Sequence, residues 1–248
     1  MNIGWIPIYA LITAWITIIT CIILYDHKEG SADWLPYISD IGAIPPSSCV
    51  FGQGFFMASV LFAITILVRF QQIKIDLNLD GPYLARFNQL SLISGLLSSI
   101  GMFIIACFQE SHYYGLHLSG LLIFMVLGFL YMCLQCVISH NLWLHGIIGC
   151  SLNIFRMLLT VILFVCFFVW LGAGYTLEQK VPSENYHSLD SSDKRLKVSS
   201  SVAEMILFLA FTLFFASFAI ELHNIKVSVK TSVNVQGVFF NVHKSQGD

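Results

Sequence analysis

The chain has 248 residues, of which 57% are hydrophobic and only 10% are charged, and its mean hydropathy is +0.79. Soluble domains carry about 25% charged residues, so a chain this apolar needs lipid as part of its solvent. The formal net charge of -2 offers no basic excess, which argues against a nucleic-acid partner. The composition therefore indicates an integral membrane protein and argues against a soluble enzyme.

Six long apolar segments can each cross a bilayer as a helix. Such a helix needs roughly 20 mostly apolar residues, because inside hydrocarbon the backbone must satisfy its own hydrogen bonds. The sequence predicts an all-α integral membrane protein, with a six-helix transmembrane bundle at 1–225 and a cytosolic C-terminal tail at 226–248. The predicted helices lie at about 3–25, 50–70, 87–108, 115–138, 153–175 and 202–222.

Lysine and arginine residues near the predicted helix ends indicate the orientation, because cytosolic loops are enriched in them. With the N-terminus in the cytosol, Arg69, Arg86 and Arg156 fall on the cytosolic side. Lys28 and the basic group at 194–197 fall on the opposite, lumenal side and weaken the bias. We expect both termini to be cytosolic.

The segment after the first predicted helix is rich in proline and glycine, yet too apolar for a free linker. Pro36, Pro45 and Pro46 restrict the backbone. Asp40 can accept backbone N–H bonds in a turn, and we expect Gly42 to adopt a conformation that other residues avoid. The pattern predicts an ordered, non-helical lumenal loop that caps the bundle. We favour this structural role for Asp40 over a ligand site.

Three ionisable residues, Glu110, His117 and Glu204, lie where predicted helices meet the lumenal boundary. Polar groups near hydrocarbon are costly and usually find partners. Our first hypothesis is a mutual hydrogen-bonded cluster that locks three helices together. A pH sensor in an acidic lumen and a proton relay remain alternatives.

Three further charged residues, Arg69, Arg156 and Glu221, lie at the predicted cytosolic boundary. Long side chains at such positions commonly extend to the headgroups. Either arginine could instead pair with Glu221 or contact an anionic lipid. We favour the interfacial role and keep the pairing as the alternative.

No motif points to catalysis or to a bound metal. Cys133 and Cys136 form a Cys-x-x-Cys on an apolar helix, but no second pair accompanies them, so we interpret both as core residues. Cys49 and Cys107 could meet as a lumenal disulfide. No serine, histidine and acid are arranged for nucleophilic catalysis. We predict no catalytic residues, no metal ligands and no cofactor.

The proline-containing loop also carries a family resemblance. The residues that carry the loop motif are Pro36, Tyr37, Ile38, Ser39, Asp40, Gly42, Pro45 and Pro46. Short matches follow in order, such as Phe108-Gln109-Glu110 and Ala203-Glu204. Together they resemble the damage-regulated autophagy modulator family, within a wider group that includes the transmembrane-150 and Sfk proteins. Met205 stands where the family commonly has tryptophan.

The resemblance implies a polytopic protein of lysosomal or endosomal membranes that modulates autophagy and cell survival. It implies contacts with membrane lipids and with membrane or cytosolic proteins, and no enzymatic reaction. One alternative is a plasma-membrane scaffold that organises phosphoinositide kinase recruitment or lipid asymmetry, as in the wider group. A lipid or small-solute transporter is a weaker alternative, because the helix centres carry no charged residues.

Overall fold

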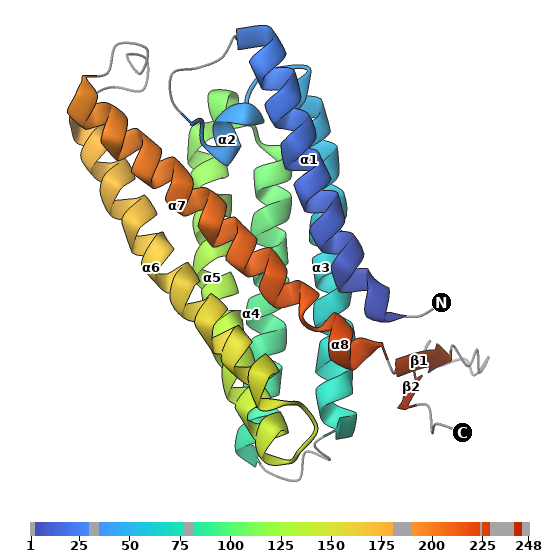
Figure 1. The fold of residues 1–248 in the computed structure, drawn as a ribbon. Helices are drawn as coiled ribbons and strands as arrows, with labels where there is room; N and C mark the ends of the chain where they lie inside the picture. The colour runs from blue at the N-terminus through green and yellow to red at the C-terminus, as the bar shows by residue number, and fades with distance from the viewer. Residues whose placement is uncertain are drawn as a thin grey trace.

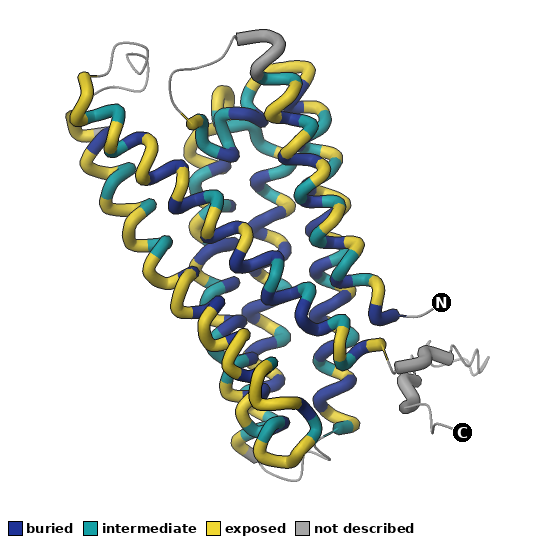
Figure 2. The backbone as a smooth tube through the Cα atoms, viewed as in Figure 1, coloured by how far each residue is buried: buried dark blue, intermediate teal, exposed yellow. Residues whose placement is uncertain are grey.

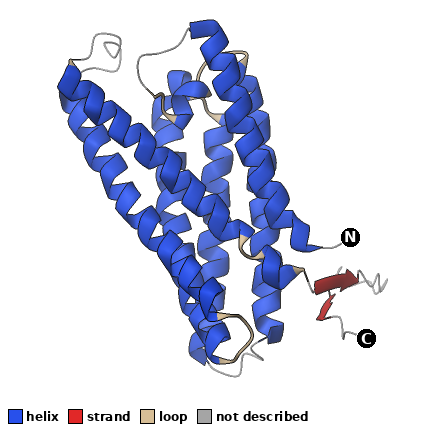
Figure 3. Ribbon diagram, viewed as in Figure 1, coloured by secondary structure: helices blue, strands red, loops and turns tan. Residues whose placement is uncertain are grey.

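The protein is an all-α bundle in a computed structural model that describes residues 3–29, 35–76, 82–180, 190–223, 225–228 and 241–244 (Figures 1 and 3). Six of its helices are long and apolar enough to cross a membrane. The predicted fold class is therefore confirmed. The elements are η1 (Ile3–Trp5), α1 (Ile6–Glu29), α2 (Ile38–Ile41), α3 (Ser47–Asp76), α4 (Pro82–Cys107), α5 (Glu110–Leu144), α6 (Cys150–Lys180), α7 (Ser191–Ala216), α8 (Ala219–Leu222), β1 (Ile225–Ser228) and β2 (Asn241–Lys244).

The short strands β1 and β2 pair antiparallel, with Ile225 opposite Lys244. They follow the bundle in a part of the chain that the sequence assigns to the tail. Residues 229–240 of the predicted tail lie outside the described residues.

The last long helix differs most from its predicted bounds. α7 begins at Ser191, well before the predicted start at 202, because the Asp190 side chain accepts hydrogen bonds from the backbone of Ser192 and Asp193. Hydropathy identifies only the part of a helix that lies in hydrocarbon. In α7, polar helical turns precede that part. α7 ends where the Ser217 hydroxyl bonds to the Phe214 carbonyl at 2.6 Å, a local bond that competes with helix continuation.

Consecutive helices pack as antiparallel neighbours: α1 on α3, α3 on α4, α4 on α5, and α6 on α7. In Figure 1, α7 crosses the face of the bundle and also meets α1. α6 is the most peripheral span, since only 17% of its apolar stretch is buried against protein, compared with 56% for α7 (Figure 2). α6 therefore presents most of its surface to lipid.

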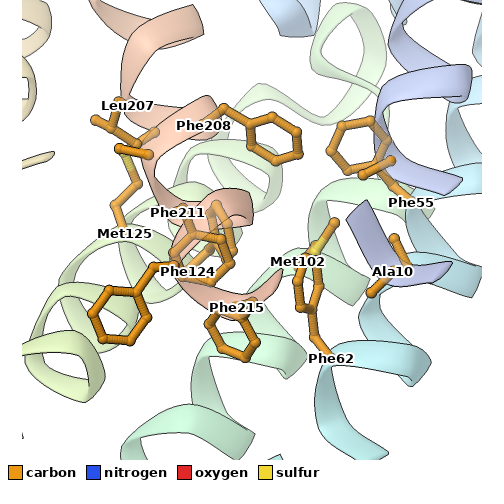
Figure 4. Packing of buried hydrophobic residues seen from close by; sticks show 14 of the residues in the cluster. Ala10, Phe55, Phe62, Met102, Phe124, Met125, Leu207, Phe208, Phe211 and Phe215 are labelled. Carbon is orange, nitrogen blue, oxygen red and sulfur yellow. The ribbon is translucent and has the colours of Figure 1, made fainter. Parts of the chain in front are cut away.

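Aromatic side chains fill the centre of the bundle (Figure 4). Phe211 and Phe215 lie one helical turn apart on α7 and point to the same side. The Phe211 ring lies 4.8 Å from Phe124 of α5, and the Phe215 ring lies 4.8 Å from Phe62 of α3, both edge to face. These contacts join α7 to both neighbouring layers.

The two ends of the transmembrane part meet at one end of the bundle. η1 packs on α8, and a Cβ added to Gly4 would lie 2.6 Å from the Cα of His223. Only glycine allows this approach of the two backbones. α2 lies at the opposite end (Figure 1).

Candidate functional site

Buried charges gather in two places, one at each end of the bundle. The arginine cluster lies near α8 and the α2 cluster lies beneath α2. The arginine cluster comprises Arg69, Arg156 and Glu221, and the α2 cluster comprises Asp40, Glu110, His117, Lys197 and Glu204.

The arginine cluster is built on a single carboxylate that two guanidinium groups share. Nη1 of Arg69 lies 2.6 Å from Oε1 of Glu221, and Nη2 of Arg156 contacts Oε2 of the same side chain. Both arginine side chains have no exposed surface. The structure thus brings together all three residues singled out in the sequence. The favoured interfacial role is wrong, because neither arginine reaches the surface.

Neutral side chains add hydrogen bonds to Arg69, whose Nη2 has no partner among the described residues. Its Nε donates to Oε1 of Gln135 at 3.2 Å, and its Nη1 donates to Oε1 of Gln72 at 2.7 Å. Gln135 donates in turn to the Ser91 hydroxyl at 3.1 Å, and Gln72 donates to Asp76 at 3.1 Å. Because the amide oxygens face the arginine, both glutamines add acceptors without adding charge.

Arg156 has its own set of acceptors. Its Nη1 donates to the Ser139 hydroxyl and its Nε to the Ser217 hydroxyl, each at 2.9 Å. The ring of Phe218 lies 4.8 Å from the guanidinium carbons of both Arg69 and Arg156. Such cation–π contacts are stronger when desolvated. The cluster therefore ties α3, α5 and α6 to the break between α7 and α8.

At the opposite end, Asp40 joins α2 to α7. The backbone N–H of Tyr37 donates to Oδ2 of Asp40 at 3.0 Å, which closes the single turn of α2. Nζ of Lys197 donates to the same oxygen at 2.9 Å and lies 3.6 Å from the centre of the Tyr37 ring. Lys197 has no exposed side-chain surface. The expectation of a non-helical loop is wrong here, because this capping bond supports one helical turn.

Gly42 has a different role from the one predicted. Its φ is -99°, an ordinary value. A Cβ at this position would lie 2.3 Å from the ring of Phe51. Gly42 is thus required by the close packing of α2 on α3, not by its backbone conformation. The remaining motif residues form α2 and the turn into α3, with a cis peptide bond between Pro45 and Pro46.

Glu204 and His117 bind backbone groups rather than each other. Oε2 of Glu204 accepts the Ile38 N–H at 2.9 Å, and Nδ1 of His117 lies 2.7 Å from the Phe108 carbonyl oxygen. Glu110 lies close enough to interact electrostatically with His117, but its Oε2 has no hydrogen-bond partner among the described residues. The three predicted residues share one layer, but within the described chain no hydrogen bond joins them directly.

A cavity of about 30 Å³ lies between these side chains. One water needs roughly 10–15 Å³ of such space, so the cavity has room for about two. His117 and Glu204 line it together with Ser39 of α2, while the rest of the wall is apolar. Nε2 of His117 is buried and has no partner among the described residues.

Several residues of both clusters escaped sequence analysis. Lys197 was expected in a loop, whereas it lies on α7. Gln135 and Ser139 were not assigned a site role, although their spacing of four places both on one face of an apolar helix. The same spacing relates Ser217 to Glu221. Polar residues spaced four apart in an apolar helix were the sequence signal that could have predicted these contacts.

The cysteines do not form a site in the described part of the chain. Cys49 and Cys107 are both free, so the possible disulfide between them is absent. Cys133 and Cys136 are half-buried on α5, and the Cys136 thiol lies 3.2 Å from the Thr160 hydroxyl. Within the described ranges, no group of three or more histidine, cysteine or acidic residues could hold a metal ion.

Comparisons with known proteins give this architecture a family. Human DNA damage-regulated autophagy modulator protein 2 is 28% identical over 218 residues, which cover 82% of this chain and 77% of that protein. The bovine protein of the same name is 35% identical over 136 residues, about half of each chain. Modulator of macroautophagy TMEM150B-B of Xenopus laevis is 27% identical over 220 residues, covering 87% of this chain and 86% of that protein. No solved structure matches.

A family model described as the Frag1/DRAM/Sfk1/Cwh43P N-terminal domain matches residues 2–225. This range includes the six spanning helices and both charged clusters. The resemblance to the damage-regulated autophagy modulators is therefore confirmed, and the chain belongs to the Frag1/DRAM/Sfk1/Cwh43P family.

Proposed function

We propose that this chain is a multi-pass membrane protein that modulates autophagy and cell survival at lysosomal or endosomal membranes, with both termini in the cytosol. It acts through contacts with lipids or protein partners and not by catalysis. The observation that carries the proposal is family membership across the whole transmembrane part, together with relatives that are named as autophagy modulators.

The use of charge in the bundle supports a regulator over a carrier. Arg69, Arg156 and Glu221 bind one another and bind side chains of neighbouring helices. Charged residues within membrane spans usually mark either a transport path or a structural pair. The direct bonds and complete burial of this cluster favour the structural pair. Lipids and partner proteins are then expected to meet the outer faces of the helices.

One serine–histidine contact has the appearance of a nucleophile–base pair, but its hydrogen bonds argue otherwise. Oγ of Ser111 lies 2.8 Å from Nδ1 of His112 and 3.0 Å from the Ala43 carbonyl oxygen. A carbonyl oxygen can only accept, and serine has one hydroxyl proton. Both contacts are satisfied when Ser111 donates to Ala43 and His112 donates to Ser111. In that arrangement His112 is not a base toward Ser111.

Localisation together with autophagic flux tests the proposal. Cells lacking the protein are rescued with a C-terminally tagged chain, which is imaged against lysosomal and plasma-membrane markers. We expect a lysosomal or endosomal signal, a tag that protease removes from sealed organelles, and flux that falls in the knockout and returns on rescue. Rescue by Lys180→Gln, a change at a half-exposed surface ion pair, is the matched control.

A plasma-membrane signal with normal flux would overturn the proposal. That outcome would favour a scaffold that organises lipids or kinases at the plasma membrane. Uptake or release of a lipid by vesicles that contain the purified protein would instead favour a transporter.

A further inference from the structure

The single turn of α2 covers the cavity of the α2 cluster. It contributes Ile38 and Ser39 to the cavity wall, and the Ile38 amide is bonded to Glu204 across that wall. Ile38 and Ile41 are buried against the bundle. Any change in the charge of the side chains that line the cavity therefore acts directly on the packing of α2 against the bundle.

The ring of His117 lines this cavity, and one of its two nitrogens has no hydrogen-bond partner among the described residues. Nδ1 lies 2.7 Å from the Phe108 carbonyl oxygen, and because a carbonyl only accepts, Nδ1 must carry a proton. In the neutral ring Nε2 is then a bare acceptor, and in the charged ring it is a donor. Nε2 is the buried nitrogen without a partner, and Glu204 and Ser39 are the other polar residues that line the cavity beside His117.

The charges of the α2 cluster are out of balance, although only Glu204 among them lines the cavity itself. Asp40 on α2, Glu110 on α5 and Glu204 on α7 contribute three carboxylates, whereas Lys197 contributes one ammonium. Burying an excess of one sign is unfavourable in a low dielectric, and a bound proton relieves it. Proton uptake by the closed cluster therefore reduces its excess of negative charge.

We propose that the α2 cluster is a hydrated proton-binding site, in which water in the cavity links Nε2 of His117 to Glu204 and proton uptake seats α2 on the bundle. The cavity has the volume for about two such waters. The physiological role, in which α2 packs more tightly when the lumen is acidic, rests on the proposed function. Proton binding by the α2 cluster does not depend on that function.

Thermodynamic linkage between proton binding and the closing of α2 sets the size of the expected effect. If closing α2 takes up one proton, the closing equilibrium becomes up to about tenfold more favourable for each unit by which pH falls. Opening of α2 releases the Ile38 amide from Glu204. Hydrogen exchange of this amide, corrected for its intrinsic rate, therefore reports the closing equilibrium.

The test is hydrogen exchange on the full chain in lipid nanodiscs, between about pH 5 and about pH 8, where histidine titrates. In the wild type we expect the protection of the peptide that contains α2 to rise several-fold as pH falls by about one unit. His117→Asn and Glu204→Gln each reduce that slope, and the double variant removes it. Glu110→Gln, of similar shape, also reduces it.

His145 provides a matched control. Its Nδ1 also lies 2.8 Å from a backbone carbonyl oxygen, that of Asn141, but it is exposed and lies at the other end of the bundle. His145→Asn should leave the α2 slope unchanged. Peptides from α8 are the internal reference for folding, and a variant that loses protection there is replaced by Glu110→Gln.

Flat protection across this pH range in the wild type would overturn the proposal, as would an unchanged slope in the folded double variant. The result is independent of localisation and flux. If protection of α2 depends on pH but the protein has no effect on flux, the proposed function is overturned and the proton site stands. If protection is flat but flux depends on the protein, the proton site is overturned and the proposed function stands.

Discussion

The two charged clusters stabilise buried charges in different ways. In the arginine cluster, the charges contact each other directly: Glu221 binds both Arg69 and Arg156, and neutral amides and hydroxyls accept hydrogen bonds from several of the remaining N–H groups. In the α2 cluster, Glu204 and His117 bind the backbone and face a shared cavity. Direct ion pairs keep the charges of the arginine cluster fixed, whereas a hydrated cavity allows the charge of the α2 cluster to change as protons bind.

Removing the shared carboxylate gives the largest expected effect. Glu221→Gln leaves two buried guanidinium groups without a counter-ion, and breaking such a buried pair typically costs about 3–5 kcal/mol. We expect a strong loss of thermal stability in detergent micelles. Lys180→Gln, which breaks a pair with a half-exposed lysine, should cost under about 1 kcal/mol.

Arg69→Met sharpens this comparison within the cluster. It leaves Arg156 and Glu221 as a balanced pair, although it also strands the amide oxygens of Gln72 and Gln135. We expect a smaller loss of stability than for Glu221→Gln. Equal losses would show that hydrogen bonding, and not charge balance, dominates the cluster.

Gly42→Ala tests how closely α2 must sit on the bundle. The added methyl group would lie 2.3 Å from the Phe51 ring, and overpacking of this kind typically costs about 1–3 kcal/mol. Thermal unfolding and exchange at α2 should both report the loss. Gly172→Ala on α6 meets no atom within 4 Å and should be neutral or slightly stabilising.

Glu204→Gln contrasts with Glu221→Gln at the other end. The amide oxygen of glutamine can still accept the Ile38 N–H, and no arginine loses its counter-ion. We therefore expect a loss of under about 1 kcal/mol at neutral pH. A loss as large as that of Glu221→Gln, measured in the same micelles, would contradict the difference drawn between the two clusters.

Asp190 provides the smallest effect and a pH reference outside the membrane spans. Hydrogen bonds from the Asp193 backbone and from Ser192 lower the pKa of Asp190 from its ordinary value of 3.8. A lowered carboxyl pKa stabilises α7 above that value, and the stabilisation is lost only as pH falls through the lower, folded value. Exchange in the first turn of α7 should therefore show constant protection between about pH 5 and about pH 8. Asp190→Ala should weaken this turn, while Asp190→Asn should preserve it.

Apolar segments long enough to span a bilayer could be identified from sequence because each is a local property. The long-range pairings could not. Arg69 and Glu221 are 152 positions apart, and Lys197 and Asp40 are 157 apart, so no spacing rule connects them. The early start of α7 was missed because Lys197 and the serines near it look like a loop until Asp40 and Trp170 supply their partners. The tight seat of Gly42 likewise depends on Phe51, which only the fold places over it.

The contact between Gly4 and His223 has a consequence for biosynthesis. The ribosome makes residues 3–5 before residues 219–223, which are made after all six spanning segments have begun. The N-terminal turn therefore gains its contact with α8 only after the last helix is inserted, whereas α1 can already pack on α3. A nascent chain halted before α8 would therefore expose the face of η1 that α8 covers in the finished bundle.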